Sequence, residues 1–421
     1  MVSVQLWSLT LSVNSRSGYE REASLIALQD YGARALPYTL PLVNDWVDVI
    51  RDQALSICIR LYGEATAAQI WDSVPHLAQV QRGQRRTDAS WRRLYRAVHT
   101  RMRRVTTAPE SSSTADLVSR YPTVDVAERQ LWNGLLAASG LLTEDVGLEL
   151  LAREPDESTK AALVRTMLRQ QPDDATLTVL LGHKNAVVRR EALRVAVRRD
   201  GLTWPGFDEL LGDPSRAVRD VAATAARRHG VVPAEVCRQR VATQPTPGFV
   251  AGLGETGYDQ DAALVEPLLH VDDPALLRAA VGAFAELRQQ ESAEVVYQML
   301  SHPHGGKTAL RMLRRLRLPV SGERCYRDYL ASDSAVARRR LLRALCTGTS
   351  WDSLPWLVRL YRDLPDDLAA ETEHAMLGWR PGFCEPTPEQ CAALTDALRE
   401  SRRVPIAVQQ LARDALASAR W

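Results

Sequence analysis

The chain has 421 residues, of which 45% are hydrophobic and 25% are charged. This length exceeds one ordinary hydrophobic core, so the chain must form several globular domains or one array of repeats. Its 53 basic and 51 acidic residues leave a formal net charge of +2. This excludes a strong overall charge that would by itself indicate a nucleic-acid or membrane partner. No segment approaches the roughly eighteen uninterrupted apolar residues of a membrane span, so no membrane partner is expected.

The first clear repeat units lie within residues 14–60. A helix is predicted over 21–32, a second over 35–43, and Arg51 begins the next unit. A cationic residue at the start of the first helix then recurs about every thirty residues along the chain. A fixed period of this length is typical of a solenoid. The recurring cations are Arg21, Arg51, Lys160, Arg189, Arg219, Arg278, Lys307 and Arg338.

The period breaks between residues 51 and 160. Nine arginines lie between 82 and 104, against the single acid Asp88. A helix is predicted there, with Trp91, Leu94, Tyr95, Val98 and Met102 on its apolar face. The other face presents Arg92, Arg93, Arg96, Arg103 and Arg104. This face suits an anionic partner surface. Alternatively, its arginines pair with acidic residues at 144–157 and 363–373 on neighbouring units.

Further units follow at 150–345, where an Asp-Pro turn precedes several predicted helices. The segments 44–51, 250–257 and Asp213-Pro-Ser-Arg-Ala-Val-Arg219 resemble HEAT repeats of the short, phycobilisome-lyase-like type. The resemblance implies stacked antiparallel helix pairs in a curved superhelix. It also implies that an Asp and an Arg six residues apart form a ladder between successive turns. The matching pairs are Asp45–Arg51, Asp213–Arg219 and Asp272–Arg278.

The predicted fold is therefore an all-α, α-solenoid of roughly ten to twelve antiparallel HEAT-like helix pairs, with second helices forming its concave face. We divide it into N-terminal repeats at 1–105, a polar linker or insertion at 106–116, a central array at 117–378 and irregular capping helices at 379–421. The six cysteines form no CxxC pair and suit reduced core residues of a cytoplasmic protein.

No catalytic motif stands out, and no cofactor or metal is predicted. Gly252, Gly254 and Gly257 fit GxGxxG, but they end a predicted helix and follow no strand, as a dinucleotide site would require. Two pairs, His302 with His304 and Cys384 with Cys391, lack further ligands for a metal. The sequence therefore predicts a protein that is not an enzyme.

The function that best fits these observations is a non-catalytic protein–protein interaction scaffold or adaptor. Its partner would be another protein, with an acidic surface, bound on the concave face. The alternative is a nucleic-acid-binding HEAT protein, including one with a DNA glycosylase-like activity on alkylated bases. Besides the arginine face, the candidate partner-binding residues are Trp46, Arg190, Arg194, Arg198, Arg339, Arg340 and Arg343.

Overall fold

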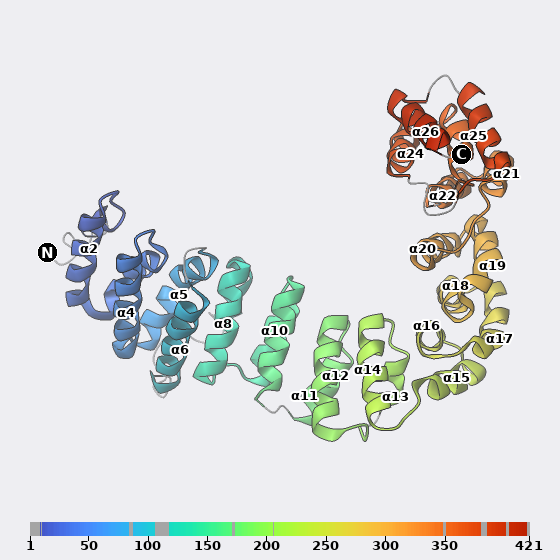
Figure 1. The fold of residues 1–421 in the computed structure, drawn as a ribbon. Coiled ribbons are helices and arrows are strands. Elements are labelled where there is room, and N and C mark those ends of the chain that lie inside the picture. Colours follow the sequence, from blue (N-terminus) through green and yellow to red (C-terminus); the bar gives the residue numbers. More distant parts are fainter. Residues whose placement is uncertain are drawn as a thin grey trace. The chain divides into compact units, whose positions relative to one another are not determined.

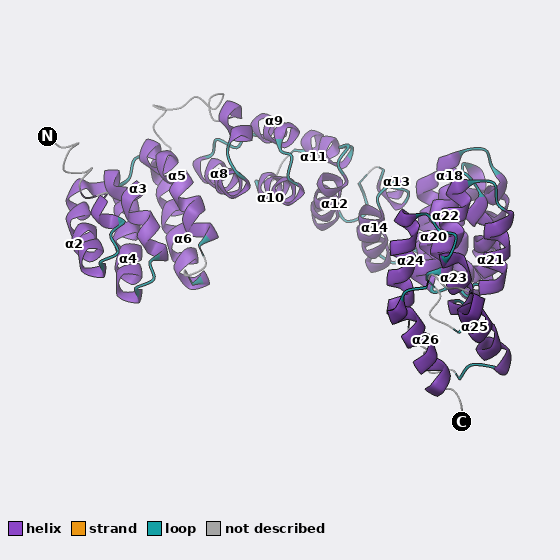
Figure 2. Cartoon of the chain, turned by 90° about the horizontal axis from the view of Figure 1, so that it is seen from above, coloured by secondary structure: helices purple, strands orange, loops and turns teal. Residues whose placement is uncertain are grey.

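The computed structural model describes residues 9, 11–83, 87–105, 118–170, 173–204, 206–347, 351–379, 385–400 and 404–418. Over these residues the protein is helical throughout and contains no strand (Figure 2). Contacts divide the chain into two units, Met1–Arg199 and Asp200–Trp421. This division falls inside the segment 117–378 that we predicted as one array. The predicted linker 106–116 lies outside the described residues.

The first unit consists of stacked helix pairs (Figure 1). Its first helices contact one another in sequence, α4 with α6, α6 with α8 and α8 with α10. These first helices are α2 (Gly18–Leu28), α4 (Asp48–Glu64), α6 (Asp88–Val105), α8 (Val126–Ser139), α10 (Glu157–Leu168) and α12 (Ala186–Asp200). The second helices are η1 (Gln29–Ala35), α3 (Leu36–Thr39), η2 (Leu40–Asn44), α5 (Ala67–Arg82), α9 (Glu144–Arg153) and α11 (Asp174–Leu181), with η3 (Tyr121–Thr123) before α8. The helix α6 thus stacks as a regular first helix.

The second unit repeats the same arrangement, and α14, α16, α18, α20 and α22 contact one another in order. Its first helices are α14 (Arg216–Arg228), α16 (Pro247–Thr256), α18 (Pro274–Arg288), α20 (Gly306–Leu316), α22 (Ala335–Leu345) and α24 (Asp366–Gly378). Its second helices are α13 (Phe207–Leu211), α15 (Pro233–Thr243), η4 (Asp259–Asp261), α17 (Ala262–Val265), η5 (Glu266–His270), η6 (Gln289–Ser292), α19 (Ala293–Gln298), η7 (Met299–Ser301), α21 (Gly322–Ala331), α23 (Leu354–Tyr361) and α25 (Pro388–Glu400). The last helix, α26 (Ile406–Ser418), contacts α24 and so continues the row of first helices. The chain is therefore an all-α solenoid of HEAT-like helix pairs.

Within the second unit the rows curve, and the first helices lie on the inner side of the curve (Figure 1). The second helices α15, α17, α19 and α21 lie on its outer side. The expectation that second helices form the concave face is therefore wrong for this unit. Three of the second-row segments contain α-helices of six residues or fewer flanked by 3₁₀ turns, and the longer first helices carry the recurring cations.

Local sequence signals set the helix boundaries. Asp273 accepts hydrogen bonds from the backbone N–H groups of Ala275 and Leu276, and Pro274 follows it at the first helical position of α18. After α14, the chain turns at Gly230 with φ of 78°, a conformation that favours glycine. These caps start and stop the helices at the intervals that produce the repeat.

The glycines of the GxGxxG match serve helix packing. A Cβ atom at Gly254 would lie 2.5 Å from the Cα atom of Ala283 in α18, and one at Gly252 would lie 2.6 Å from the carbonyl oxygen of Leu211. Only glycine allows helices to approach so closely. Among the described residues, no helix combines the length and apolar character needed to cross a membrane.

Candidate functional site

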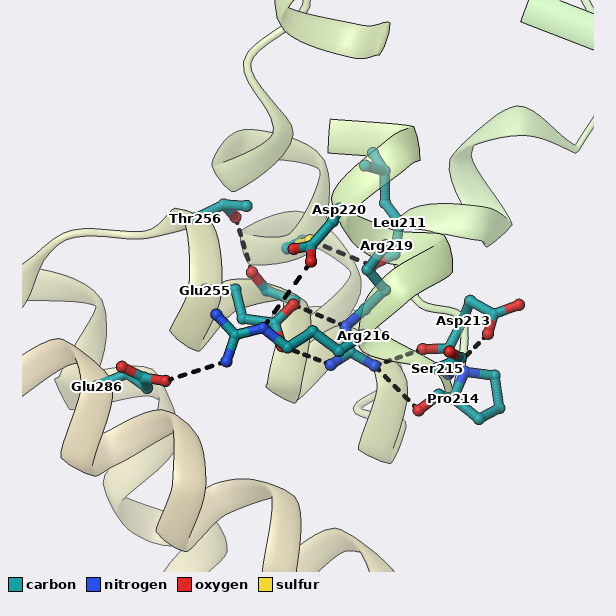
Figure 3. A network of polar contacts seen from close by, with 12 residues as sticks. Leu211, Asp213, Pro214, Ser215, Arg216, Arg219, Asp220, Glu255, Thr256 and Glu286 are labelled. Atoms are coloured by element: carbon teal, nitrogen blue, oxygen red, sulfur yellow. Dashed lines mark hydrogen bonds and ion pairs between the residues drawn. The ribbon is translucent and has the colours of Figure 1, made fainter. Parts of the chain in front are cut away.

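Three buried arginines join neighbouring helix pairs. Arg219 in α14 forms two hydrogen bonds, of 2.6 and 2.9 Å, with the carboxylate of Glu255 in α16 (Figure 3). Arg21 forms the same fork, at 2.8 and 3.0 Å, with Asp45 at the turn before α4. Arg129 in α8 pairs at 2.9 Å with Glu154, whose carboxylate also accepts the Tyr121 hydroxyl. These pairs tie one repeat to the next.

The six-residue spacing has a different cause from the one we predicted. Arg51 donates to the backbone carbonyl oxygen of Asp45 at 3.2 Å, and its second bond goes to the Asp48 carboxylate. Arg219 likewise donates to the carbonyl oxygen of Asp213, at 2.6 Å. The predicted side-chain pairs Asp45–Arg51 and Asp213–Arg219 are therefore corrected to side-chain-to-backbone bonds. The same bond reaches a carbonyl six residues upstream from Arg21, Arg189 and Arg338.

The predicted rung between Asp272 and Arg278 is not formed within the described part of the chain. Both residues are exposed, and no hydrogen bond or ion pair joins Arg278 to any described residue. Lys307, the next recurring cation, is also exposed and has no such partner there. Arg278, which we predicted as a ladder residue, and Lys307 therefore both present cationic groups without a partner among the described residues.

These two cations line a hollow of about 1200 Å³ on the first-helix row of the second unit. Arg311, Arg314 and Arg315 of α20 line it as well. Our sequence analysis missed these three arginines. A signal was present, because residues 295–322 contain five cations and no acid. We call this feature the α16–α20 hollow.

The arginine face predicted on α6 is present. Leu94, Val98 and Met102 are buried beneath the helix, between α4 and α8. On the outer side, five arginines are exposed and have no ion-pair or hydrogen-bond partner among the residues that the structure describes. They are Arg92, Arg93, Arg96, Arg103 and Arg104. We call them the α6 arginine face.

The aromatic residues of α6 pack inward. The rings of Trp91 and Tyr95 stack with centroids 5.6 Å apart, and His99 lies 4.1 Å from Tyr95. A Cβ atom on Gly134 of α8 would lie 2.3 Å from the Tyr95 hydroxyl oxygen, so these side chains occupy the space left by that glycine. Burial and the charge of Arg103 lower the pKa of His99 to about 4, so His99 is neutral at physiological pH.

A smaller surface hollow of about 370 Å³ is lined by residues of α4 and α6. Its apolar lining includes Ile59 and Ala97, and Arg93, Arg96 and Arg104 stand around it. Arg101 also borders the hollow, but it donates to the carbonyl oxygens of Ala65 and Glu64 and so caps α4. The α6 arginine face thus adjoins an apolar recess.

The acidic stretches that we considered as partners for the α6 arginine face have other contacts. Glu154 binds Arg129, and Glu157 binds Lys160. Within 363–373, Asp367 binds Arg339 and Glu371 binds Arg343. None of these ion pairs involves the α6 arginine face, so the alternative of internal neutralisation finds no support among the described residues.

Most of the other candidate residues have structural contacts. Arg190 and Arg194 both bind Glu191, a buried acid on their own helix, and Arg198 donates to the Arg194 carbonyl oxygen. Arg340 donates to the carbonyl oxygens of residues 300, 302 and 303. Trp46 is 60% exposed, and the Arg21 guanidinium lies 5.1 Å from its ring centroid. The helices α12 and α22, which carry these arginines, are first helices.

The sequence contains two pairs of possible metal ligands, His302 with His304 and Cys384 with Cys391, for which we predicted no metal site. His302 accepts backbone N–H bonds from His304 and Gly305 through Nδ1, so it caps a turn. Cys384 lies outside the described residues. Among those described, no cluster of three or more His, Cys, Asp or Glu side chains could hold a metal ion.

No family model and no curated protein matches the chain. One similar solved structure is Kap121p bound to Pho4p, at 10% sequence identity and a TM-score of 0.36. The alignment covers 93% of this chain and 49% of the Kap121p chain. Another is a structure of microtubule polymerases with TOG domain arrays, at 11% identity and a TM-score of 0.24, covering 87% and 90%. The chain spans about half the length of the karyopherin Kap121p chains. At these TM-scores the likeness is too loose to carry an inference about function.

Proposed function

We propose that this protein is a non-catalytic interaction scaffold whose α6 arginine face binds an acidic surface on a partner protein. One observation carries the proposal: the five arginines of that face are exposed and have no partner among the described residues, whereas Arg21, Arg129, Arg219 and Arg343 each bind a carboxylate. Like charges on one helix repel, so an unpaired cluster lowers stability unless a partner neutralises it.

The composition of the face suits carboxylates on a protein. Each guanidinium presents a fork of N–H donors that can bind a carboxylate at two points. The adjoining hollow, with Ile59 and Ala97 in its lining, offers a place for an apolar side chain of the same partner. A protein surface provides both kinds of group.

Nucleic acid is the second candidate, because the same arginines could bind phosphates. Binding of single strands also uses aromatic side chains that stack on bases. Trp91 and Tyr95 are half-buried and stack on each other, so the aromatic groups nearest to the face are engaged. This engagement favours the protein partner, and it also disfavours a glycosylase-like activity at this face.

The cellular setting and the subtype are part of the proposal. Cys58, Cys237 and Cys325 are buried free thiols. Burial raises the pKa of Cys58 to about 12. Unreactive reduced thiols suit a cytoplasmic protein. We also keep the short, phycobilisome-lyase-like HEAT type as our proposed subtype.

The test compares the double variant R92E/R96E with the control R16E/R34E. Arg16 and Arg34 are exposed arginines of the same unit, and neither side chain has a partner among the described residues. Both variants change the net charge equally. We expect labelled polyglutamate to bind the wild-type chain and the control, and to bind R92E/R96E at least tenfold more weakly.

A parallel titration uses duplex DNA from low salt to about 0.15 M. If duplex DNA does not bind even at low salt, the result supports a protein partner. Affinity for duplex near physiological salt, with a steep salt dependence that R92E/R96E removes, would replace our proposal by the nucleic-acid function. Equal binding of polyglutamate by both variants would contradict a role for this face.

A further inference from the structure

The α16–α20 hollow is a second basic feature, in the other unit of the chain. Many of the residues that line it come from the first two turns of three successive helices: Pro247 to Ala251 of α16, Ala275 to Ala279 of α18, and Lys307 to Arg311 of α20. Arg219 of α14, Arg314 and Arg315 of α20 and Arg343 of α22 complete its cationic lining. Consecutive first helices run side by side in this unit (Figure 1). Their N-terminal ends therefore meet around one recess, and their dipoles add to its positive potential.

Arg314 donates to the carbonyl oxygen of Arg343 at 3.5 Å, and the other six cations of this hollow fall into two groups. Arg219, Arg315 and Arg343 bind Glu255, Glu286 and Glu371, respectively. Arg216 also lies 3.8 Å from Glu286 and 3.8 Å from Glu255, so these acids are shared within a network (Figure 3). Internal ion pairs thus neutralise this first group.

Arg278, Lys307 and Arg311 form the second group. Each is exposed, and none has a carboxylate partner among the residues that the structure describes. The lining of the hollow includes no acidic side chain. Three positive charges therefore face the recess without internal compensation. Arg219, which is equivalent to Arg278 in an earlier repeat, is by contrast buried and paired with Glu255.

The rest of the lining is small or apolar. Pro247, Ala251, Ala275 and Ala279 expose little more than backbone and methyl groups, and Leu310 lies at the edge. Short side chains let another polypeptide approach closely. Apolar side chains of that polypeptide would gain binding free energy by covering this apolar surface and removing it from water. We call these small and apolar residues the floor of the recess, and the cations of the second group lie beside it.

We propose that the α16–α20 hollow binds an acidic segment of a partner protein that also carries apolar side chains. Its carboxylates would bind Arg278, Lys307 and Arg311, and its apolar side chains would cover Ala275, Ala279 and Pro247. A volume of about 1200 Å³ far exceeds a single phosphate group. A nucleic-acid backbone would match the cations, but it would leave the apolar floor without a partner.

The experiment uses the full chain and three synthetic peptides of equal length. The first contains Glu and Leu in equal number, the second replaces Glu by Gln, and the third contains Glu alone. The variant K307E/R311E is compared with R227E/R228E, which reverses two exposed charges at the C-terminal end of α14, outside this hollow. Circular dichroism melting confirms that both variants fold.

We expect the Glu-and-Leu peptide to bind the wild-type chain and R227E/R228E, and to bind K307E/R311E at least tenfold more weakly. In the R92E/R96E variant, which removes binding at α6, the Gln-and-Leu and all-Glu peptides should each bind at least tenfold more weakly than the first peptide. The proposal is overturned if the all-Glu peptide binds this variant as well as the first peptide does, because the apolar floor then contributes nothing. Equal loss in both variants would also overturn it.

Two further outcomes separate this site from the α6 arginine face and from nucleic acid. If R92E/R96E removes the binding of the Glu-and-Leu peptide and K307E/R311E does not, the peptide binds at α6 and the inference about the hollow fails alone. Duplex DNA that competes for the hollow and depends on Lys307 and Arg311 would assign it to nucleic acid. Retention of peptide binding in R92E/R96E supports an independent second site.

Discussion

Arg219 and Glu255 lie 36 residues apart in the sequence and form a two-point ion pair between α14 and α16. Their side chains are 8% and 12% exposed. Nη1 of Arg219 donates to the carbonyl oxygens of Asp213 and Pro214, so one side chain connects α14, α16 and the turn before α14. Arg278 occupies the same position in a later repeat and has no carboxylate partner among the described residues.

Arg219→Ala should lower the free energy of unfolding by about 3 kcal/mol, because it leaves the Glu255 carboxylate unpaired in a mostly buried place. Urea unfolding followed by circular dichroism measures this loss. A double-mutant cycle with Glu255→Gln should show that the two losses are not additive. Additive losses would mean that the pair itself contributes nothing.

Arg278→Ala should change the free energy of unfolding by less than about 0.5 kcal/mol, because an exposed side chain without a partner contributes little. The same urea experiment tests it. A loss as large as that of Arg219→Ala would show that Arg278 is structural after all, as we predicted from the period. It would also remove one of the three cations assigned to the α16–α20 hollow.

Gly254→Ala should destabilise the protein by about 1–3 kcal/mol, since the new methyl group would lie 2.5 Å from the Ala283 Cα atom and force α16 and α18 apart. Thermal melting detects this change. The control is Gly282→Ala in α18, where a Cβ atom would meet only Thr308 Cγ2 at 3.9 Å. That variant should gain up to about 1 kcal/mol from helix propensity. Similar effects in both variants would refute the packing role of Gly254.

The protein should lose stability between pH 6.5 and pH 4 through His99. The pKa of His99 in the folded chain is lowered to about 4 from its ordinary value of 6.5, so the unfolded chain binds the proton first as the pH falls. The stabilisation is full above pH 6.5 and is lost progressively toward pH 4. The difference of 2.5 pKa units corresponds to roughly 3 kcal/mol.

His99→Gln should remove this part of the pH dependence, and the exposed His270→Gln serves as the control. Urea unfolding at several pH values between 4 and 7 measures both. If His99→Gln keeps the wild-type slope over this interval, His99 is protonated in the folded chain and our account of its surroundings is wrong.

Sequence periodicity predicted the helices and their pairing well, because apolar spacing and Asp-Pro turns are local signals. It could not tell Arg219 from Arg278, because the distinction depends on a partner far along the chain. Observed partners lie 24, 25 or 36 residues downstream: Asp45 for Arg21, Glu154 for Arg129 and Glu255 for Arg219. The corresponding position 36 residues after Arg278 is Arg314. A cation there cannot complete the pair.

The α6 arginine face was predictable because it depends on one helix alone. Trp91, Leu94 and Met102 mark the inner side by their spacing, and the arginines occupy what remains. The α16–α20 hollow was not predictable, since its lining comes from several successive first helices that the sequence keeps far apart. Only the row of first helices brings Ala251, Ala275 and Lys307 to one recess.

The bond from five of the recurring arginines to a carbonyl oxygen six residues upstream bears on how such repeats change during evolution. Every residue has a backbone carbonyl, so Ser15, Asp45, His183, Asp213 and Ser332 serve equally well as acceptors. Substitution at this position leaves the bond intact. Successive repeats can therefore drift apart in sequence while their geometry persists. A sequence profile that rewards an acid at this position would score such repeats poorly.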